Sequence, residues 1–204
     1  MTISYPLALP STKFIGINVG VNDVVGKAVS PFTLTQQVQR HQGQAWELEF
    51  ELPPMERAEA EQWITWFMKL KGMYGTFLAP AAVNRVPAGT WAGTPVLNGN
   101  HAALSNEINL GGLTVGATVK AGDYLQLGSG NFTRLHKLLE DGTADVNGEV
   151  TAEIWPNIRE ALLDGDAVVF NNAVGVFRLA SNNRRWELGN SRFYSMRFAA
   201  VEAL

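Results

Sequence analysis

Aspartates in glycine-rich turns are the groups of this sequence most suited to chemistry. They are Asp141, Asp145, Asp164 and Asp166. A glycosidase would hold two such carboxyl groups at a defined separation in a cleft, and a calcium loop would alternate oxygen ligands along one short segment. The stretch from Asp141 to Glu149 lacks the full calcium pattern. We therefore expect these aspartates to accept hydrogen bonds from turn amides.

The histidines and glycine runs form no complete chemical motif. His41, His101 and His136 are scattered through turn-rich or strand-like segments without metal-type pairing, so structural or surface roles are expected. The glycine run at 128–130 lies between predicted strands, whereas a phosphate loop opens a helix. The sequence has no cysteine, which excludes disulfides, thiolate zinc sites and a cysteine nucleophile. We expect no cofactor, no metal and no enzymatic activity.

Aromatic residues are the remaining candidates for ligand contact. Trp63, Trp66 and Phe67 recur at helical spacing, which predicts a core or a subunit interface rather than a ligand box. Tryptophans elsewhere, if exposed, suit either stacking on a sugar or sealing an interface. The tryptophans considered for these two roles are Trp91, Trp155 and Trp186.

Alternating apolar and polar residues predict a long antiparallel hairpin before residue 53. Its strands are expected over 32–39 and 46–52, with the turn at 41–44. Phe32, Leu34 and Val38 are expected on one face of the first strand. In the second strand, apolar residues face the core while the intervening residues Glu47, Glu49 and Glu51 face outward. Because like charges on one face repel, they need water, cations or the basic groups of a neighbour.

An amphipathic helix is predicted over residues 55–71. Pro53 and Pro54 end the preceding strand, and the apolar residues that follow recur at helical spacing. Glutamates near the predicted start of the helix and lysines near its end complement the helix dipole. Gly72 follows the last turn, where glycine commonly ends a helix. A further strand is expected at 73–78.

The sequence pattern changes beyond Ala79, where short apolar runs typical of strands are interrupted by Gly, Asn and Pro. Such strands indicate a small barrel or sandwich. Long alternating strands return after residue 175. We therefore predict an outer domain of residues 1–78 and 176–204, into which residues 79–175 are inserted as a small β domain. The expected fold class is mainly β (α+β).

The amino-acid composition limits the classes of partner that the chain is expected to bind. The chain has 204 residues, 46% of them hydrophobic and 17% charged, which leaves a weakly charged surface suited to partner contacts. Its net charge of -3 gives no general attraction to duplex DNA or an anionic membrane. The N-terminal residues lack the features of an export signal, and no apolar run is long enough to span a membrane.

Several segments carry a family resemblance: WITWFMKLKGMYGTFLAP, VKAGDYLQLG, DVNGEV, IWPNIREALLDGDAV and GVFRLA. Together with the order of hairpin, helix, strand, inserted β domain and closing strands, they resemble the distal tail proteins of long, flexible-tailed (siphovirus-like) bacteriophages and gene transfer agents. The resemblance covers about residues 30–204.

The resemblance implies a tail-tube-like β-sandwich with an inserted barrel similar to oligonucleotide/oligosaccharide-binding (OB) domains. Six copies of such a protein would form a ring at the distal end of the tail tube. The ring would join the tube protein to the tail-tip or baseplate hub, and DNA would pass through its channel without specific binding. The protein would be assembled in the host cytoplasm and would reside in the virion tail.

Two questions stay open at this point. Glu47, Glu49 and Glu51 could line the lumen of the ring, where an acidic wall repels DNA phosphates. Alternatively, they face solvent or pair with Arg and Lys of the next subunit. A carbohydrate-binding module in the inserted domain, contacting the host surface, is the main competing function, and a cell-wall-degrading enzyme with convergent carboxylates is another.

Overall fold

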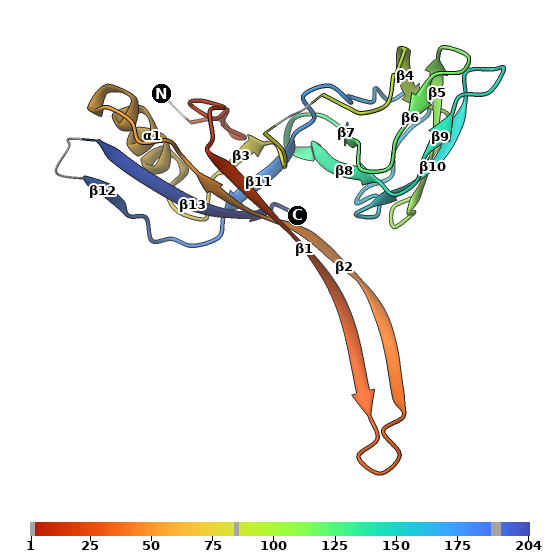
Figure 1. The fold of residues 1–204 in the computed structure, drawn as a ribbon, viewed down its shortest axis with the longest axis horizontal. Helices are drawn as coiled ribbons and strands as arrows, with labels where there is room; N and C mark the ends of the chain where they lie inside the picture. Colours follow the sequence, from red (N-terminus) through yellow and green to blue (C-terminus); the bar gives the residue numbers. More distant parts are fainter. Residues whose placement is uncertain (1–2, 84–85, 189–192) are drawn as a thin grey trace.

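A computed structural model describes residues 3–83, 86–188 and 193–204 (Figure 1). Met1 and Thr2, at the start of the segment in which no export signal is expected, lie outside these residues. The described chain is mainly β, with one α-helix and strands in a six-stranded, a five-stranded and a two-stranded sheet. The expected fold class, mainly β with one helix and a small barrel-like part, is confirmed.

The six-stranded sheet combines strands from both ends of the chain. Its order is β1 (Gly16–Val29), β2 (Gln36–Glu51), β13 (Tyr194–Glu202), β11 (Gly175–Leu179) and β3 (Thr76–Ala79), with β12 (Trp186–Leu188) paired to β13. The neighbouring strands are antiparallel, and Phe50 of β2 lies opposite Phe198 of β13. Segments on both sides of the stretch 80–174 therefore share one sheet. The division of the chain into two domains stays a prediction.

The helix α1 (Arg57–Leu70) covers one face of this sheet (Figure 1). Its aromatic residues are buried together with Phe50, Phe77 and Phe198. Phe50 stacks on Phe198 with ring centroids 4.7 Å apart, and Trp66 meets Phe77 edge-on at 4.9 Å. The helix ends at Leu70, one residue before the predicted end, and Lys71 and Gly72 follow it in left-handed conformations, φ 52° and 70°, the second of which glycine adopts without strain.

The second part of the structure is a five-stranded sheet with a two-stranded companion. The five strands, in order, are β4 (Gly93–Leu97), β5 (Glu107–Leu113), β10 (Val150–Trp155), β8 (Arg134–Leu138) and β7 (Tyr124–Leu127). The companion pairs β6 (Thr118–Val119) with β9 (Gly142–Thr143), and a short 3-10 turn, η1, covers Gly130–Phe132. Alternate residues of these strands bury a second apolar cluster that includes Ile108, Leu125 and Ile154.

The prediction of a hairpin before residue 53 is wrong in its first strand and in the position of its turn. Residues 36–51 form one continuous strand, β2, which pairs with β1 rather than with residues 32–39. The turn lies at 30–35, where the Leu34 amide donates to the Ser30 carbonyl and the Ser30 amide donates to the Thr35 carbonyl. The predicted turn at 41–44 is instead a register shift within the ladder, because three residues of β2 oppose Val24 alone.

The residues predicted to face the core are wrong for the first predicted strand and correct for the second. Phe32 and Leu34, expected to be inward, are 94% and 73% exposed at the turn. The second strand is correctly predicted: Trp46, Leu48 and Phe50 are buried, and the glutamates between them point to the opposite face. The difference arises because only the latter part of β2 is covered: Phe50 lies in the aromatic cluster beneath α1, and Trp46 packs against Tyr124 and Trp155.

Candidate functional site

The most distinctive element of the molecule is a two-stranded arm made by the outer halves of β1 and β2. Figure 1 shows it projecting away from the rest of the six-stranded sheet and from the five-stranded part. We define the arm as residues 24–43; every one of them is exposed or half-exposed. Valines favour the extended conformation of its β1 side. At about 3.3 Å per residue, the β1 side alone carries the turn roughly 20 Å beyond the body.

One surface of the arm combines valines with cations. In the ladder Val25 lies opposite Arg40, and Lys27 lies opposite Val38. Ladder partners share a face, as do alternate residues of one strand. We call this surface the basic arm face: Val25, Lys27, Val29, Val38 and Arg40. The chain has no acidic residue between positions 24 and 43, so no carboxylate within the arm offsets the charges of Lys27 and Arg40.

The three glutamates of β2 lie at the base of the arm, on the sheet face opposite α1. Glu47 accepts a hydrogen bond from Asn22 Nδ2 at 3.0 Å, and Glu49 accepts one from Asn18 Nδ2 at 3.2 Å. Glu51 is ion-paired with Arg197. Within the described ranges of the chain, Glu47 and Glu49 have no ion-pair partner. Their two charges are therefore available to a cation from outside.

A shallow hollow of about 350 Å³ lies beside these two glutamates. The ladder places Ala199 opposite Glu49 and Val201 opposite Glu47, so small apolar side chains flank the carboxylates. We call this surface the acidic hollow. Its lining is Asn18, Val19, Gly20, Glu47, Leu48, Glu49, Ala180, Ala199, Ala200 and Val201.

The predicted helix aromatics lie inside the core of the six-stranded sheet. Trp63, Trp66 and Phe67 are 2%, 5% and 7% exposed. Trp66 Nε1 donates to the carbonyl of Ala8 at 2.8 Å, which ties the N-terminal segment to the helix. In this chain they belong to the core.

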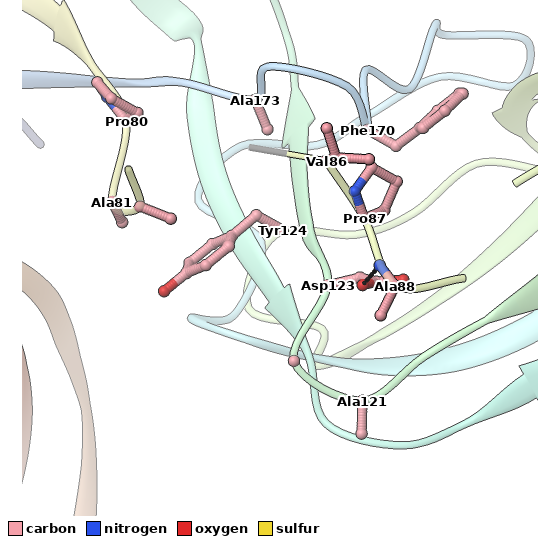
Figure 2. A pocket seen from close by; sticks show the side chains of 12 residues that line it. Pro80, Ala81, Val86, Pro87, Ala88, Ala121, Asp123, Tyr124, Phe170 and Ala173 are labelled. Atoms are coloured by element: carbon pink, nitrogen blue, oxygen red, sulfur yellow. Dashed lines mark hydrogen bonds between the residues drawn. The ribbon is translucent and has the colours of Figure 1, made fainter. Parts of the chain in front are cut away.

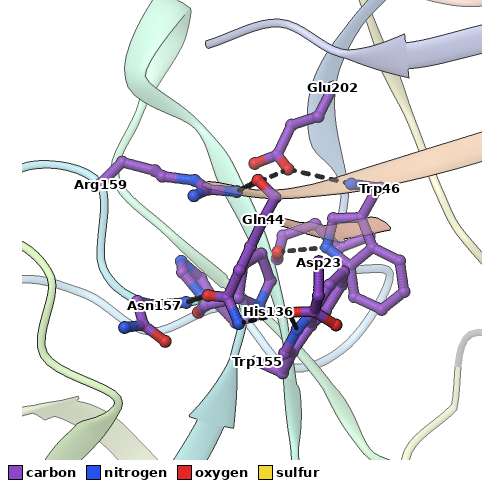
Figure 3. A network of polar contacts seen from close by, with 10 residues as sticks. Asp23, Gln44, Trp46, His136, Trp155, Asn157, Arg159 and Glu202 are labelled. Atoms are coloured by element: carbon purple, nitrogen blue, oxygen red, sulfur yellow. Dashed lines mark hydrogen bonds and ion pairs between the residues drawn. The ribbon is translucent and has the colours of Figure 1, made fainter. Parts of the chain in front are cut away.

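A buried polar network joins the base of the arm to the five-stranded part (Figure 3). Arg159 Nη2 lies 3.0 Å from Glu202 Oε2, and the same oxygen accepts from the Trp46 amide at 3.2 Å. Arg159 also donates to the Gln44 carbonyl. The side chains of Arg159 and Glu202 are only 12% and 3% exposed, so this ion pair is largely shielded from water.

Gln44 and Asp23 extend the network to the ladder pair that directly adjoins the arm. Gln44 Nε2 donates to Asp23 at 2.9 Å, and its Oε1 accepts from the Asn157 amide at 2.8 Å. Trp155 Nε1 donates to Asp23 at 3.1 Å. The hydrogen bonds from Gln44 and Trp155 lower the pKa of Asp23. The base of the arm is thus held from both strands.

A hollow of about 260 Å³ lies next to a second buried carboxylate, Asp123 (Figure 2). Asp123 accepts from the amides of Ala88 and Gly89 at 2.6 and 3.0 Å, and from Trp91 Nε1 at 2.7 Å. The Lys120 amide donates to it as well, at 3.1 Å. These donors occupy both carboxylate oxygens, so Asp123 holds the segment before β4 in place.

The expected turn role of the four aspartates is confirmed. Asp145 accepts from the amides of Asn147 and Glu149, and Asp141 from the amide of Ala121 and from Lys120 Nζ. Both sets of hydrogen bonds lower the pKa of the accepting aspartate. The other two aspartates accept amide hydrogen bonds from Gly99 (to Asp164) and Leu163 (to Asp166).

The histidines have the structural or surface positions that were expected. Burial lowers the pKa of His136 to about 4, so the ring is neutral at pH 7 and its Nδ1 donates to the Pro156 carbonyl at 2.7 Å. His101 Nε2 accepts from the Asn109 amide at 2.8 Å, and His41 lies exposed on the arm. The described residues contain no cluster of three or more His, Cys, Asp or Glu side chains placed to hold a metal.

The three tryptophans considered for contact with a sugar or a partner differ in exposure. Trp91 is buried and stacks on Phe170, with ring centroids 5.1 Å apart. Trp155 is half-buried against Trp46. Trp186 is 41% exposed, which leaves it as the member of the group with most surface for a partner.

Sequence reasoning missed the arm and its cations, although two signals were present. Ile17, Val19 and Val21 alternate with small or polar residues, as strands do, and valines then continue to Val29 without any acidic residue after Asp23. No model of a known protein family matches the chain, and no curated protein matches it either. Among the described residues, no helix has the length and apolar character needed to cross a membrane.

Proposed function

We propose that this chain is a non-enzymatic structural protein of a bacteriophage tail, six copies of which form a ring at the distal end of the tail tube. The ring joins the tube protein to the tail-tip or baseplate hub and leaves a channel for DNA. It is assembled in the host cytoplasm and resides in the virion tail. The family comes from the resemblance of residues 30–204, and the physical support comes from the arm.

The exposed arm is the observation that carries the proposal. A two-stranded ribbon is marginally stable by itself in water. This one also exposes apolar side chains from its base to its tip, including Phe32, Leu34 and Val38. Contiguous exposed apolar surface marks sites of contact with other proteins. An element of this kind gains stability when further chains cover it, which favours a role in assembly.

The charge distribution supports a channel through which DNA passes without binding. Duplex binding needs clustered Lys and Arg that displace counterions from phosphates. The chain has a net charge of -3, and its exposed cations on the arm belong to a surface rich in valine. An arm covered by neighbouring chains would not present these cations to DNA.

The test is the mass and symmetry of the purified full-length particle, measured by native mass spectrometry and negative-stain microscopy. We expect a six-fold ring with a central hole, either from the protein alone or after it is added to tail tubes that lack it. A variant with residues 26–39 replaced by Asn-Gly is the matched control, and it should give no ring. A wild-type chain that stays monomeric under both conditions would contradict the proposal.

Carbohydrate binding remains the second candidate function, favoured by one hollow of about 360 Å³ in the five-stranded part. Its lining includes Phe132, which is 60% exposed, together with Arg134 and Ser129. An exposed aromatic ring beside polar groups suits a sugar. A glycan array with the full chain and with a Phe132→Ala variant decides this point: binding by the wild type that the variant loses would favour the second candidate.

A further inference from the structure

We propose that the basic arm face of one copy docks on the acidic hollow of a second copy of this chain. The inference rests on the self-assembly in the proposed function and names the contact that produces it. It also assigns Glu47 and Glu49 to a subunit interface rather than to the lumen of the ring. The partner is a second copy because the arm and the hollow complement each other in charge, spacing and apolar content.

The charges match in number and sign. The arm face contributes Lys27 and Arg40, and the hollow contributes Glu47 and Glu49. Within the part of the chain that the structure describes, none of these four side chains has an ion-pair partner. A contact between two copies therefore pairs two cations with two carboxylates, which fixes register and disfavours other partners.

The spacing of the charges matches as well. Lys27 lies opposite Val38, two residues from Arg40, so the two cations are diagonal neighbours, roughly 7 Å apart between Cβ atoms. Glu47 and Glu49 are alternate residues of one strand, which also places them about 7 Å apart. Both cations can therefore meet a carboxylate in a single docked arrangement.

Apolar side chains separate the charges on both surfaces. Val25, Val29 and Val38 of the arm face are each about half-exposed. On the other side, Ala199 and Val201 flank the glutamates. Docking buries these valines against small side chains, and apolar burial contributes most of the stability of such contacts.

The arm cannot reach the hollow of its own chain. Both belong to the continuous strands β1 and β2, and the polar network around Asp23 and Gln44 holds the strands where the arm begins. An intramolecular contact would require both strands to reverse direction. The two surfaces consist of different residues, so the contact between copies is heterologous and repeats from one copy to the next. Such contacts form rings when the rotation closes.

Charge reversal tests the pairing directly. We expect the arm variant Lys27→Glu/Arg40→Glu and the hollow variant Glu47→Lys/Glu49→Lys each to lose self-association, with apparent Kd weakened at least tenfold in sedimentation experiments. A 1:1 mixture of the two variants should associate again, because each acidic arm then meets a basic hollow. The matched control Lys13→Glu/Lys69→Glu changes the same charge elsewhere on the surface and should behave as the wild type.

Disulfide trapping tests the contact without relying on stable association. The natural chain has no cysteine, so single introduced cysteines report one contact each. Oxidation of a mixture of Val38→Cys and Ala199→Cys chains should give a covalent dimer of the two. Replacing Ala199→Cys by Val146→Cys, a remote exposed site, should not. Trapping no greater than this control would overturn the docking contact, even if six-fold rings form and the proposed function stands.

Discussion

Arg159 and Glu202 form a largely buried ion pair between the two parts of the structure. Removing one member leaves the other charge buried without its partner, which typically costs about 3–5 kcal/mol. We expect Arg159→Met to lower the free energy of unfolding by roughly this amount in urea titrations. The double variant Arg159→Met/Glu202→Met should be more stable than the single one; equal destabilisation by both would show that the unpaired charge of Glu202 is not the cause of the loss.

His136 makes stability depend on pH between neutrality and about pH 4. Its folded pKa, about 4, lies below the ordinary value of 6.5, so the unfolded chain takes up a proton at a pH where the folded chain does not. Stability is therefore complete above pH 6.5 and falls as the pH drops toward 4. From pH 7.5 to pH 5 the loss is about 2 kcal/mol, given 1.36 kcal/mol per pKa unit. The variant His136→Gln should show a smaller loss over this range, measured by urea unfolding; an unchanged slope would assign the pH dependence to other groups.

At the scale of elements, the arm should affect assembly far more than folding. Replacing residues 26–39 by Asn-Gly joins the ladder partners Val25 and Arg40 through a two-residue turn. Because the deleted residues are exposed or half-exposed, we expect the monomer's free energy of unfolding to change by less than about 1 kcal/mol. Self-association should be lost in sedimentation experiments. A large drop in monomer stability would mean that the arm is part of the fold.

Helices and strands were predictable from the sequence where burial of one face imposes a regular spacing on the apolar residues. The helix, the inward residues Trp46, Leu48 and Phe50, and many of the short strands follow from alternation or helical spacing. The arm lies in water on both faces, so no core selects its register, and the polar segment at 41–44 resembles a turn although it lies within β2, at the register shift of the β1–β2 ladder. The network around Arg159 depends on residues far apart in the chain, which local patterns do not encode.

At the scale of the whole molecule, the acidic strand distinguishes two arrangements of the proposed ring. Replacing Glu47, Glu49 and Glu51 by Gln in the phage removes the partners of the arm cations, so we expect few assembled tails by electron microscopy. The lumen arrangement gives a different result: tails of normal structure whose DNA ejection is slower and depends on salt. The latter outcome would return the three glutamates to the channel wall.

The pairing of β2 with β13 also sets a time at which folding on the ribosome can finish. Phe50 stacks on Phe198, roughly 150 residues later, so its core stays open until β13 has been synthesised. At about 5–20 residues per second, that interval lasts roughly 7–30 seconds. Throughout it, Trp46, Leu48 and Phe50 are exposed on a nascent strand beside the helix. High expression rates should therefore favour contact between unfinished chains, and slower translation or a chaperone that covers β2 should raise the yield of soluble protein.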